Sequence, residues 1–373
     1  MILPKSADVV IIGAGVVGCS IAYHLAREGC RDVVVLEKDI IGNGTTARCT
    51  GGIRLQMTSE VDILMSQLSL EFFENFSAEM GNDPEFRQVG YLFLLGNEEQ
   101  LATAAGNVAL QRRLGVPVTL MGRQELASQA PFMFWDDVAG ATFCSCDGYL
   151  NPYEVTQGFA RQARRLGVRI FQGTEAVAIE VKGRRVQGVS TSQGKVATPL
   201  LVNAAGPYAA KVGRMAGVEL PVWAQRRHVF ITTPFDEIPS TMPLVVDQVQ
   251  GFVCRKEGRG LMLNAYDATD TQDYDTTIDW QVLPQVANKA VHRLPSLSEV
   301  GILTGWVGLR EITPDEEAIL GFVPQVEGFV CANGFSGHGF MHAPATGRLI
   351  AELVLRGKTS IDISPLSLRR FGG

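Results

Sequence analysis

The chain has 373 residues, an apolar fraction of 46% and a net charge of −6, with its basic residues dispersed. A globular chain of this length has room for about two domains, and the dispersed charge argues against nucleic-acid binding. The seven cysteines are scattered without a CxxC pair, and the five histidines form no cluster with metal-ligand spacing. These features predict a cytoplasmic protein with reduced thiols and no metal site.

The N-terminal segments predict a βαβ unit. The residues "ADVVIIGAG" are typical of a buried parallel strand, "VVGCSIAYHLAREG" of a helix that ends at Gly29, and "DVVVLEKD" of a second buried strand. Gly13 permits a tight turn, Gly15 lets the backbone approach a pyrophosphate, and Gly18 lets helix and strand pack closely. Glu37 ends the second strand, where an acid accepts hydrogen bonds from ribose hydroxyls. This order predicts a dinucleotide-binding site.

The same apolar stretch has a second interpretation as an export signal or membrane span. Glycines interrupt it, Glu28 and Asp32 follow it closely, and only Lys5 supplies positive charge before it. A signal peptide needs a basic segment before its apolar core. The dinucleotide interpretation is therefore favoured, and no membrane span is expected.

The next elements in the chain are a helix and a β-meander. The residues "NPYEVTQGFARQARRLG" predict a helix with Asn151 as its N-cap and Pro152 at its first position. A meander is expected over 168–206, with turns at Gly183 and Gly194. It ends in the buried strand "LLVNAAG", which closes on Gly206 and resembles another strand of the cofactor sheet.

Five further segments are short, β-rich and bounded by turns: "VGYLFLLG", "VAGATFCS", "RRHVFITT", "GFVCRKEG" and "GLMLNAYD". They predict an antiparallel sheet formed by two separate stretches of the chain. The predicted fold class is α/β, an α+β arrangement of two interleaved domains. A discontinuous cofactor domain is expected at 1–85, 151–215 and 301–373, and a substrate-binding sheet domain at 86–150 and 216–300.

Six ordered motifs resemble those of FAD-dependent amine oxidoreductases. They are "ADVVIIGAGVVGCSIAYHLAREGCRDVVVLEKD", "GNGTTARCTGGIR", "DGYLNPYEV", "LVNAAGPYA", "REITPDEEAILG" and "ANGFSGHGFMHAPATG". The chain is similar to the D-amino-acid oxidase superfamily, in the branch of sarcosine oxidase, glycine oxidase and the proline dehydrogenase β-subunit. This resemblance covers nearly the whole chain. It implies a glutathione-reductase-like FAD-binding Rossmann domain with an antiparallel substrate sheet over the flavin.

The resemblance also implies which residues bind FAD. The pyrophosphate is expected at the first glycine turn, the adenosine ribose at Glu37 with Lys38 alongside, and adenine at the backbone of Val177. The remaining contacts are expected along the middle of FAD and at its isoalloxazine ring. The full implied set is Gly13, Ala14, Gly15, Val17, Gly18, Glu37, Lys38, Gly44, Thr45, Thr46, Arg48, Gly51, Gly52, Ile53, Val177, Ala204, Ala205, Gly206, Gly308, Arg310, Phe335, Ser336, Gly337, His338, Gly339, Phe340 and Met341.

The segment "GFSGHGFM" has a physical reason to lie against the flavin. A reduced flavin carries negative charge near N1 and C2=O, and a helix N-terminus offers unpaired N–H groups and a positive dipole end. Glycines at 337 and 339 let the backbone come close to a flat ring. The alternative is a glycine-rich helix entry without a ligand.

The implied reaction is oxidation of a C–N bond by hydride transfer to FAD, giving an imine that either hydrolyses or stays cyclic. An amino-acid substrate needs a cation for its carboxylate, and arginine is the natural bidentate partner. By resemblance Arg54 and Arg310 are the candidates, each with a structural ion pair as the alternative. Tyr266 is a candidate substrate contact or a packing residue, and His338 a candidate polar contact at the site or a loop histidine bonded to backbone.

Three positions depart from the monomeric sarcosine oxidases. Gly308 replaces the cysteine that holds FAD covalently there, which predicts non-covalent FAD. Met341 replaces a lysine that helps hold carboxylate, which suits a bulkier or less polar substrate. Met262 replaces the lysine that promotes reaction with oxygen, which favours a dehydrogenase.

The leading hypothesis is oxidation of a small secondary amine amino acid, such as sarcosine, proline or a similar N-alkyl amino acid. One alternative is an FAD-bearing β-subunit that passes electrons to a partner subunit instead of oxygen, and another is a glycine or D-amino-acid oxidase. A NAD-dependent dehydrogenase leaves "GFSGHGF" without a role. A non-catalytic flavoprotein leaves the two arginines without one.

Overall fold

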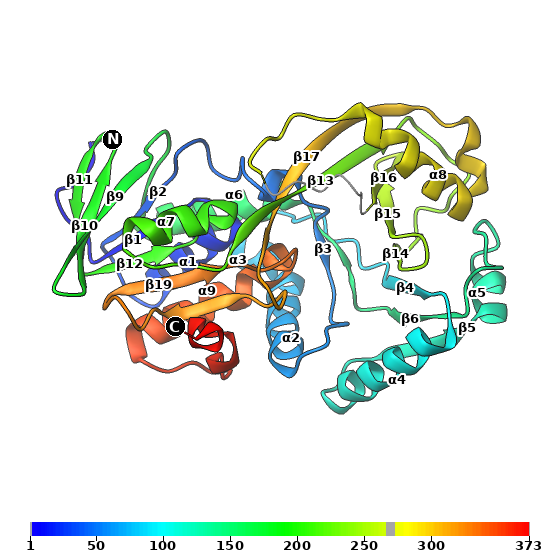
Figure 1. Ribbon diagram of the computed structural model, residues 1–373, viewed down its shortest axis with the longest axis horizontal. Helices are drawn as coiled ribbons and strands as arrows, with labels where there is room; N and C mark the ends of the chain where they lie inside the picture. Colours follow the sequence, from blue (N-terminus) through cyan, green and yellow to red (C-terminus); the bar gives the residue numbers. More distant parts are fainter. Residues whose placement is uncertain (1, 266–272, 373) are drawn as a thin grey trace.

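The computed structural model describes residues 2–265 and 273–372, and these form two sheet-centred halves (Figure 1). A six-stranded sheet of order β18-β19-β12-β1-β2-β8 centres one half, and an eight-stranded sheet of order β17-β13-β16-β15-β14-β4-β6-β5 centres the other. The long strands β13 and β17 run from one half into the other (Figure 1). The two-domain α/β fold expected from the sequence is thereby confirmed.

The six-stranded sheet contains the predicted βαβ unit. Four parallel strands, β12, β1, β2 and β8, pair side by side, and β19 extends them in parallel while β18 adds an antiparallel edge. Their bounds are β1 Val9–Ile12, β2 Val33–Leu36, β8 Arg169–Phe171, β12 Leu200–Asn203, β18 Ile319–Phe322 and β19 Phe329–Asn333. β8 therefore belongs to this sheet and not to the expected meander, because its partner β2 lies far away in sequence.

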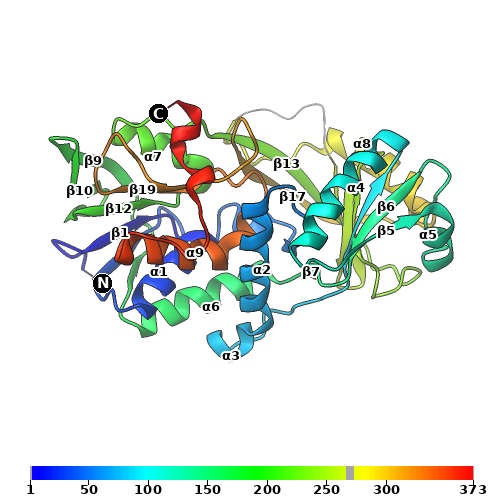
Figure 2. The ribbon, with the colours of Figure 1, turned by 90° about the horizontal axis from the view of Figure 1, so that it is seen from below.

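Three helices cover one face of this sheet, and a small second sheet together with one further helix covers the other. Alternate strand residues face each side: Val9 and Ile11 pack with α1, α6 and α9, whereas Val10 and Ile12 pack with α7 and the meander. Figure 2 shows these two layers on opposite sides of the sheet. The covering elements are α1 Val16–Arg27, α6 Pro152–Arg165, α7 Ala209–Met215, α9 Gly339–Arg356, β9 Ala176–Lys182, β10 Arg185–Thr191 and β11 Gly194–Ala197.

The eight-stranded sheet gathers strands from both predicted stretches. It is antiparallel except where β14 and β4 pair in parallel, because these strands belong to different stretches of the chain. The strands are β4 Tyr91–Leu95, β5 Val118–Gly122, β6 Gly140–Cys144, β13 Trp223–Thr232, β14 Leu244–Asp247, β15 Phe252–Glu257, β16 Gly260–Ala265 and β17 Ile302–Ile312. The exact domain bounds stay a prediction, with β17 lying just beyond the expected boundary at 300.

The remaining elements connect the halves or flank the eight-stranded sheet. Strands β3 Gly52–Ile53 and β7 Gly148–Tyr149 pair with each other, and helices α2 Glu60–Glu74 and α3 Phe76–Met80 follow β3. Helices α4 Glu98–Arg113, α5 Arg123–Gln129 and α8 Leu283–Arg293 flank the sheet (Figure 2). None of the described helices has both the length and the apolar character needed to cross a membrane.

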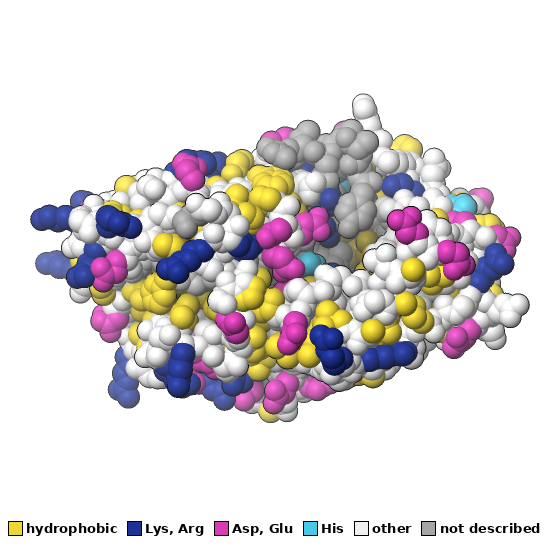
Figure 3. Space-filling model, turned by 60° about the horizontal axis from the view of Figure 1, so that its bottom comes forward, with side chains coloured by type: hydrophobic (Ala, Val, Ile, Leu, Met, Phe, Trp, Pro, Cys, Tyr) yellow, Lys and Arg dark blue, Asp and Glu magenta, His cyan; other side chains and the backbone are white. Residues whose placement is uncertain are grey.

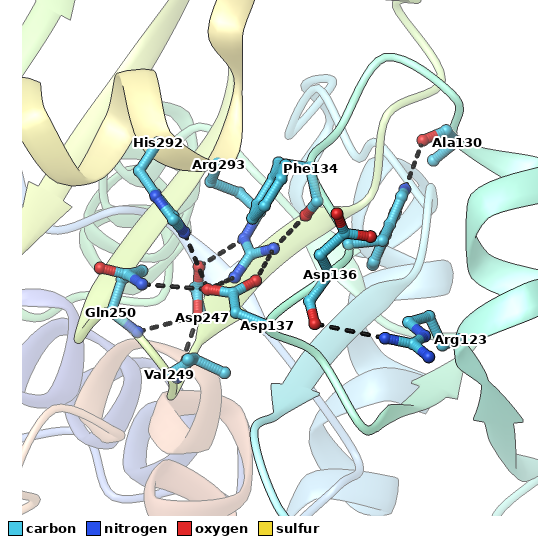
Figure 4. A network of polar contacts seen from close by, with 11 residues as sticks. Arg123, Ala130, Phe134, Asp136, Asp137, Asp247, Val249, Gln250, His292 and Arg293 are labelled. Atoms are coloured by element: carbon cyan, nitrogen blue, oxygen red, sulfur yellow. Dashed lines mark hydrogen bonds and ion pairs between the residues drawn. The ribbon is translucent and has the colours of Figure 1, made fainter.

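A buried ionic network fixes α8 to the sheet (Figure 4). Arg293, at the end of α8, is fully buried and donates to the carboxylate of Asp247 at 2.6 Å and to that of Asp137 at 3.1 Å. Although burial opposes it, hydrogen bonds from His292 and Arg293 hold the pKa of Asp137 below its ordinary value. Buried charges need such partners, so this network is structural.

All seven cysteines are free thiols, as the sequence predicted.

Candidate functional site

The first glycine turn lies at the carboxyl end of β1, between the ends of its neighbours. The N–H of Gly13 donates to Leu36 at 2.8 Å, and that of Ala204 donates to Ile12 at 2.9 Å, so three strand ends meet here. Gly13 has φ +107°, and a Cβ on it would lie 2.3 Å from the carbonyl oxygen of Ala204. A Cβ on Gly18 would lie 2.0 Å from the carbonyl oxygen of Gly13. Glycine is therefore required at both positions.

The start of α1 has the properties of an anion site. Gly15 is its N-cap and supplies no side-chain cap, and the first turn contains no acidic residue. Among the residues that the structure describes, only the Oγ1 of Thr46, at 3.3 Å, lies within 4 Å of a Cβ placed on Gly15, so this backbone is open to a ligand. Unpaired N–H groups and the helix dipole at such an end suit a pyrophosphate.

Glu37 joins the second strand to the glycine turn. Its carboxylate accepts from the N–H of Ala14 at 2.8 Å and from the N–H of Asp39 at 2.9 Å. Its own backbone oxygen accepts from the N–H of Thr174 at 2.7 Å, which places the start of β9, with Val177, on the same side. Glu37, predicted to bind the ribose, and Val177, predicted to contact adenine, thus lie beside the glycine turn that is predicted to bind the pyrophosphate. This arrangement of residues fits a dinucleotide.

The segment 44–53 leads from this turn toward the other half. The Oγ1 of Thr46 accepts from the N–H of Val16 at 3.1 Å, and the Oγ1 of Thr45 donates to the carbonyl oxygen of Leu309 at 2.6 Å. Arg48 donates to the carbonyl oxygens of Asn43 and Gly44. These contacts make the segment a bridge between α1 and β17, as a ligand that spans both halves requires.

A cavity of about 810 Å³ lies where the segment 49–58 and the start of α9 meet the eight-stranded sheet, whose edge strand β17 supplies part of the lining. Figure 3 shows the molecule hollowed near its middle, with acidic side chains gathered beside the hollow. The predicted residues that line the cavity come from three separate segments and are brought together only by the fold. They are Gly51, Gly52, Arg54, Arg310, Ser336, Gly337, His338, Phe340 and Met341.

Arg310 is an available cation in this cavity. It is half-buried on β17, and within the described part of the chain no carboxylate or carbonyl accepts a hydrogen bond from its guanidinium. Gly337 has φ +100°, and a Cβ on it would lie 3.1 Å from the Cζ of Arg310, so the turn leaves room for this group. Across residues 2–265 and 273–372 the N–H of Gly337 also has no acceptor. A half-buried guanidinium without a partner is suited to binding an anionic ligand group.

Arg54 is already engaged in the same cavity. It donates to the Nε2 of His338 at 2.9 Å and to the carbonyl oxygen of Gln56, and it lies 5.3 Å from the ring centre of Phe93. Because an arginine side chain can only donate hydrogen bonds, the Nε2 of His338 is the acceptor in this bond. The ring proton of the neutral His338 is therefore on Nδ1. Burial, followed by the nearby Arg54, His342 and Arg310, lowers the pKa of His338 well below its ordinary value. The imidazole is therefore a neutral support for Arg54.

Several predicted residues lie outside the cavity lining. Met262 is buried in a small apolar cluster with Val229 and Ile231. Phe335 is fully buried in the core beneath the turn, next to Gly339. A Cβ on Gly308 would lie 3.2 Å from the Cβ of Arg48. Tyr266 lies outside the described residues.

Polar residues of the eight-stranded sheet complete the lining and were not predicted. Gln225, Arg227 and Asn264 line the cavity from β13 and β16, and Tyr91 lines it from β4. Arg227 is bonded to its neighbours, with its guanidinium donating to Gln225 at 3.2 Å. Their alternation along the strands is a sequence signal for one shared face, but the strand pairing that brings them together is set by tertiary structure.

Three carboxyl groups in or near the cavity wall have raised pKa values. Burial raises the pKa of Glu311 to about 7, and the N–H of Gly334 donates to its carboxylate at 2.9 Å. Burial, followed by the neighbouring Asp62, raises the pKa of Glu317 to about 8. Burial also raises the pKa of Asp147, which supports Gln56 and the backbone of Leu55, to about 6. Because burial favours the protonated form of these carboxyl groups, they neutralise the arginines of the cavity less than ordinary carboxylates would.

Comparison with known proteins identifies the architecture. The profile of the DAO family, described as FAD dependent oxidoreductase, matches residues 8–353. Human mitochondrial sarcosine dehydrogenase is 30% identical over 99% of this chain, and FAD-dependent oxidoreductase domain-containing protein 1 of Xenopus laevis is 31% identical over 99%. The chain spans 42% of the length of the first relative and 83% of the second.

Solved structures agree with this match. L-proline dehydrogenase from P. horikoshii superposes with a TM-score of 0.93 at 32% identity, over 99% of each chain. Glycine oxidase from Geobacillus kaustophilus superposes with a TM-score of 0.89 at 24% identity, over 98% of this chain and 99% of the other. At 24% identity the second structure shows the shared fold alone.

Proposed function

Because the chain belongs to the FAD dependent oxidoreductase family, we propose that it oxidises the C–N bond of a small secondary amine amino acid, such as sarcosine, proline or a similar N-alkyl amino acid. The names of two similar proteins support this substrate class, sarcosine dehydrogenase and L-proline dehydrogenase. Each is about 30% identical to this chain, which leaves the individual amine to experiment.

The observation that carries this proposal is the unpaired guanidinium of Arg310 in the cavity. A carboxylate accepts two parallel N–H bonds from an arginine, which fixes the orientation of an amino acid as well as its position. Arg54 provides a second cation across the cavity, held in place by His338. Met341 and Phe340 supply an apolar wall that suits alkyl groups on the nitrogen or on the α-carbon.

Bound FAD supplies the two-electron acceptor, and the chain supplies orientation and electrostatics. Arg310 binds the carboxylate, and the N–H of Gly337 and the positive end of α9 stabilise negative charge near the turn. Phe340 and Met341 exclude water from the apolar side of the cavity. The neutral His338 keeps Arg54 in position without adding a further charge.

Anaerobic reduction of the flavin across a panel of amines tests this proposal. Bleaching of the flavin absorbance is expected with sarcosine, proline or another N-alkyl amino acid, and weaker bleaching with the corresponding amines that lack a carboxylate. Preferred reduction by glycine or by a D-amino acid would instead assign the oxidase alternative. The proposal is overturned if no amino acid in the panel reduces the flavin.

The FAD is proposed to be bound non-covalently. Gly308 has no side chain to form a bond, and even a Cβ at this position would press against Arg48. Precipitation with acid is expected to release all of the yellow chromophore into the supernatant. A flavin that stays with the precipitated protein would contradict this assignment.

A second candidate concerns the electron acceptor. Met262 is apolar and packs with Val229 and Ile231, so it offers no positive charge to promote reaction with oxygen. This favours an FAD-bearing subunit that passes electrons to a partner chain. Slow reoxidation of the reduced flavin by air and fast reoxidation by an artificial acceptor are expected. Stoichiometric peroxide release at the rate of turnover would assign an oxidase instead.

A further inference from the structure

Two tyrosines and two lysines stack on one another beside the predicted FAD channel. The rings of Tyr208 and Tyr274 are stacked with centroids 4.8 Å apart. The Nζ of Lys38 lies 3.5 Å from the ring centre of Tyr208, and the Nζ of Lys211 lies 3.7 Å from that of Tyr274. We call these four side chains the aromatic clasp. Cation–π contacts and ring stacking hold it together.

The clasp joins the two halves of the molecule. Lys38 follows β2, Tyr208 follows β12 and Lys211 lies in α7, all in the half with the glycine turn. Tyr274 belongs to the segment between β16 and α8 of the other half, the yellow chain that follows the grey trace in Figure 1. Arg226 of β13 donates to the carbonyl oxygen of Thr277 at 2.6 Å, so this segment is anchored to the sheet domain.

The clasp also crosses the end of β1. Strands β12 and β2 flank β1 on either side, with Asn203 and Leu36 both in register with Ile12. Neighbouring strands lie about 4.8 Å apart, so the loops that carry Lys38 and Tyr208 start about 10 Å from each other. Their contact therefore spans the space next to the glycine turn. Glu37 and the start of α1, which are predicted to bind the ribose and the pyrophosphate, lie at this turn.

We propose that the aromatic clasp is a latch that closes over the adenosine–pyrophosphate part of bound FAD and slows its release. Tyr274 is the positioning residue that connects this latch to the sheet domain. The latch extends FAD binding to a residue outside the glycine motifs, and it does not depend on which amine is oxidised. The aromatic clasp can open only when the rings of Tyr208 and Tyr274 separate. The strength of this ring contact therefore sets the rate at which FAD is released.

The test measures FAD release from the holoprotein. After dilution into an excess of an FAD-binding apoprotein, apo-glucose oxidase, as a trap, FAD release is followed by the loss of the flavin signal of the holoprotein. The wild type is compared with Tyr274→Ala, Tyr274→Phe and Lys211→Met. The matched control is Tyr153→Ala, whose exposed ring lies on α6, in none of the clasp contacts. The melting temperature of each apoprotein is measured in parallel.

Tyr274→Ala is expected to release FAD about 10-fold faster, because one stack and one cation–π contact are lost. Tyr274→Phe keeps both contacts and is expected to stay within about 2-fold of the wild type, and Lys211→Met is expected to fall between them. If Tyr274→Ala does not fold, the surface variant Lys211→Met decides the test. The latch is overturned if neither variant accelerates FAD release, or if Tyr153→Ala accelerates it equally. FAD release is measured without any amine, so a failure of the proposed substrate class would not alter the outcome of this test.

Discussion

At the scale of single residues, Arg310 is free to bind an anion because no neighbouring side chain of the described residues fills the space beside its guanidinium or pairs with it. Gly337 has no side chain to fill the space against its guanidinium, and no carboxylate of the described chain pairs with it. Glu311, next to it in sequence, turns instead toward the N–H of Gly334. An arginine that is half-buried without a partner costs free energy, and an anionic substrate that pairs with it recovers that cost.

A buried histidine near the cavity makes stability depend on pH. His342 is fully buried, and its Nε2 shares a hydrogen bond of 2.9 Å with the hydroxyl of Ser66. Burial lowers the pKa of His342 to about 4, although the nearby carboxylate of Asp62 acts to raise this pKa. Above its ordinary pKa of 6.5 the ring is neutral in both the folded and the unfolded chain. Between pH 6.5 and 4 the unfolded chain binds the proton more tightly, so the free energy of unfolding falls as pH decreases.

The variant His342→Gln cannot take up this proton. Its free energy of unfolding is expected to fall less steeply than that of the wild type between pH 6.5 and 4, by on the order of 1–3 kcal/mol in total. Denaturant titrations at several pH values measure both slopes. Parallel slopes for the two proteins would show that His342 titrates normally in the folded state.

At the scale of elements, α9 depends on a close approach to α1. A Cβ on Gly347 would lie 2.2 Å from the Oγ of Ser20 and 2.6 Å from the Nδ1 of His24, so any side chain forces the helices apart. Since α9 begins at the turn that carries His338 and Gly337, a shift of this helix moves the cavity wall as well.

Gly347→Ala is therefore expected to destabilise the fold by about 1–3 kcal/mol, the usual cost of overpacking a core. Gly106→Ala is the matched control, because Gly106 lies in α4 with nothing within 4 Å of its added Cβ. The control is expected to be neutral or stabilised by about 0.5–1 kcal/mol, since alanine favours helix. Equal effects in the two helices, measured by urea unfolding, would refute the close-contact explanation.

The sequence predicted elements better than their pairing. The βαβ unit was readable because apolar runs, glycines and Glu37 follow one another within one local stretch. The parallel pairing of β8 with β2 and of β14 with β4 could not be predicted, because the two strands of each pair lie more than a hundred residues apart in the sequence. Register between distant strands is decided by packing of their side chains, and no local pattern encodes it.

At the scale of the whole molecule, the candidate site is assembled between the two halves. Arg54, Arg310, His338 and Met341 come from three separate motifs and meet in one cavity, as the family resemblance implied. Gln225, Arg227 and Asn264, which also line the cavity, could not be predicted, because their shared face appears only once β13 and β16 pair. The roles of these residues toward substrate and FAD stay predictions.

The sheet half depends on the buried network of Figure 4. Arg293→Met leaves the buried carboxylate of Asp247 without its cation and is expected to lower the free energy of unfolding by about 3–5 kcal/mol. Arg259→Met, which breaks an exposed ion pair with Asp236, is the control and is expected to leave the unfolding midpoint unchanged. A midpoint for Arg293→Met that equals the wild-type value would show that the network contributes no net stability.

The most direct measurement of the central claim is anaerobic flavin reduction by L-proline and by pyrrolidine, which lacks the carboxylate, in the wild type and in Arg310→Met. Loss of a charge-assisted pair of about 1.5–3 kcal/mol predicts that the variant binds proline about 10- to 100-fold more weakly. Reduction by pyrrolidine should change by less than about 2-fold, because that amine makes no carboxylate contact. If proline is not a substrate, sarcosine and dimethylamine form the equivalent pair. An Arg310→Met variant that binds the amino acid as tightly as the wild type would contradict the assignment of Arg310 as the carboxylate-binding residue.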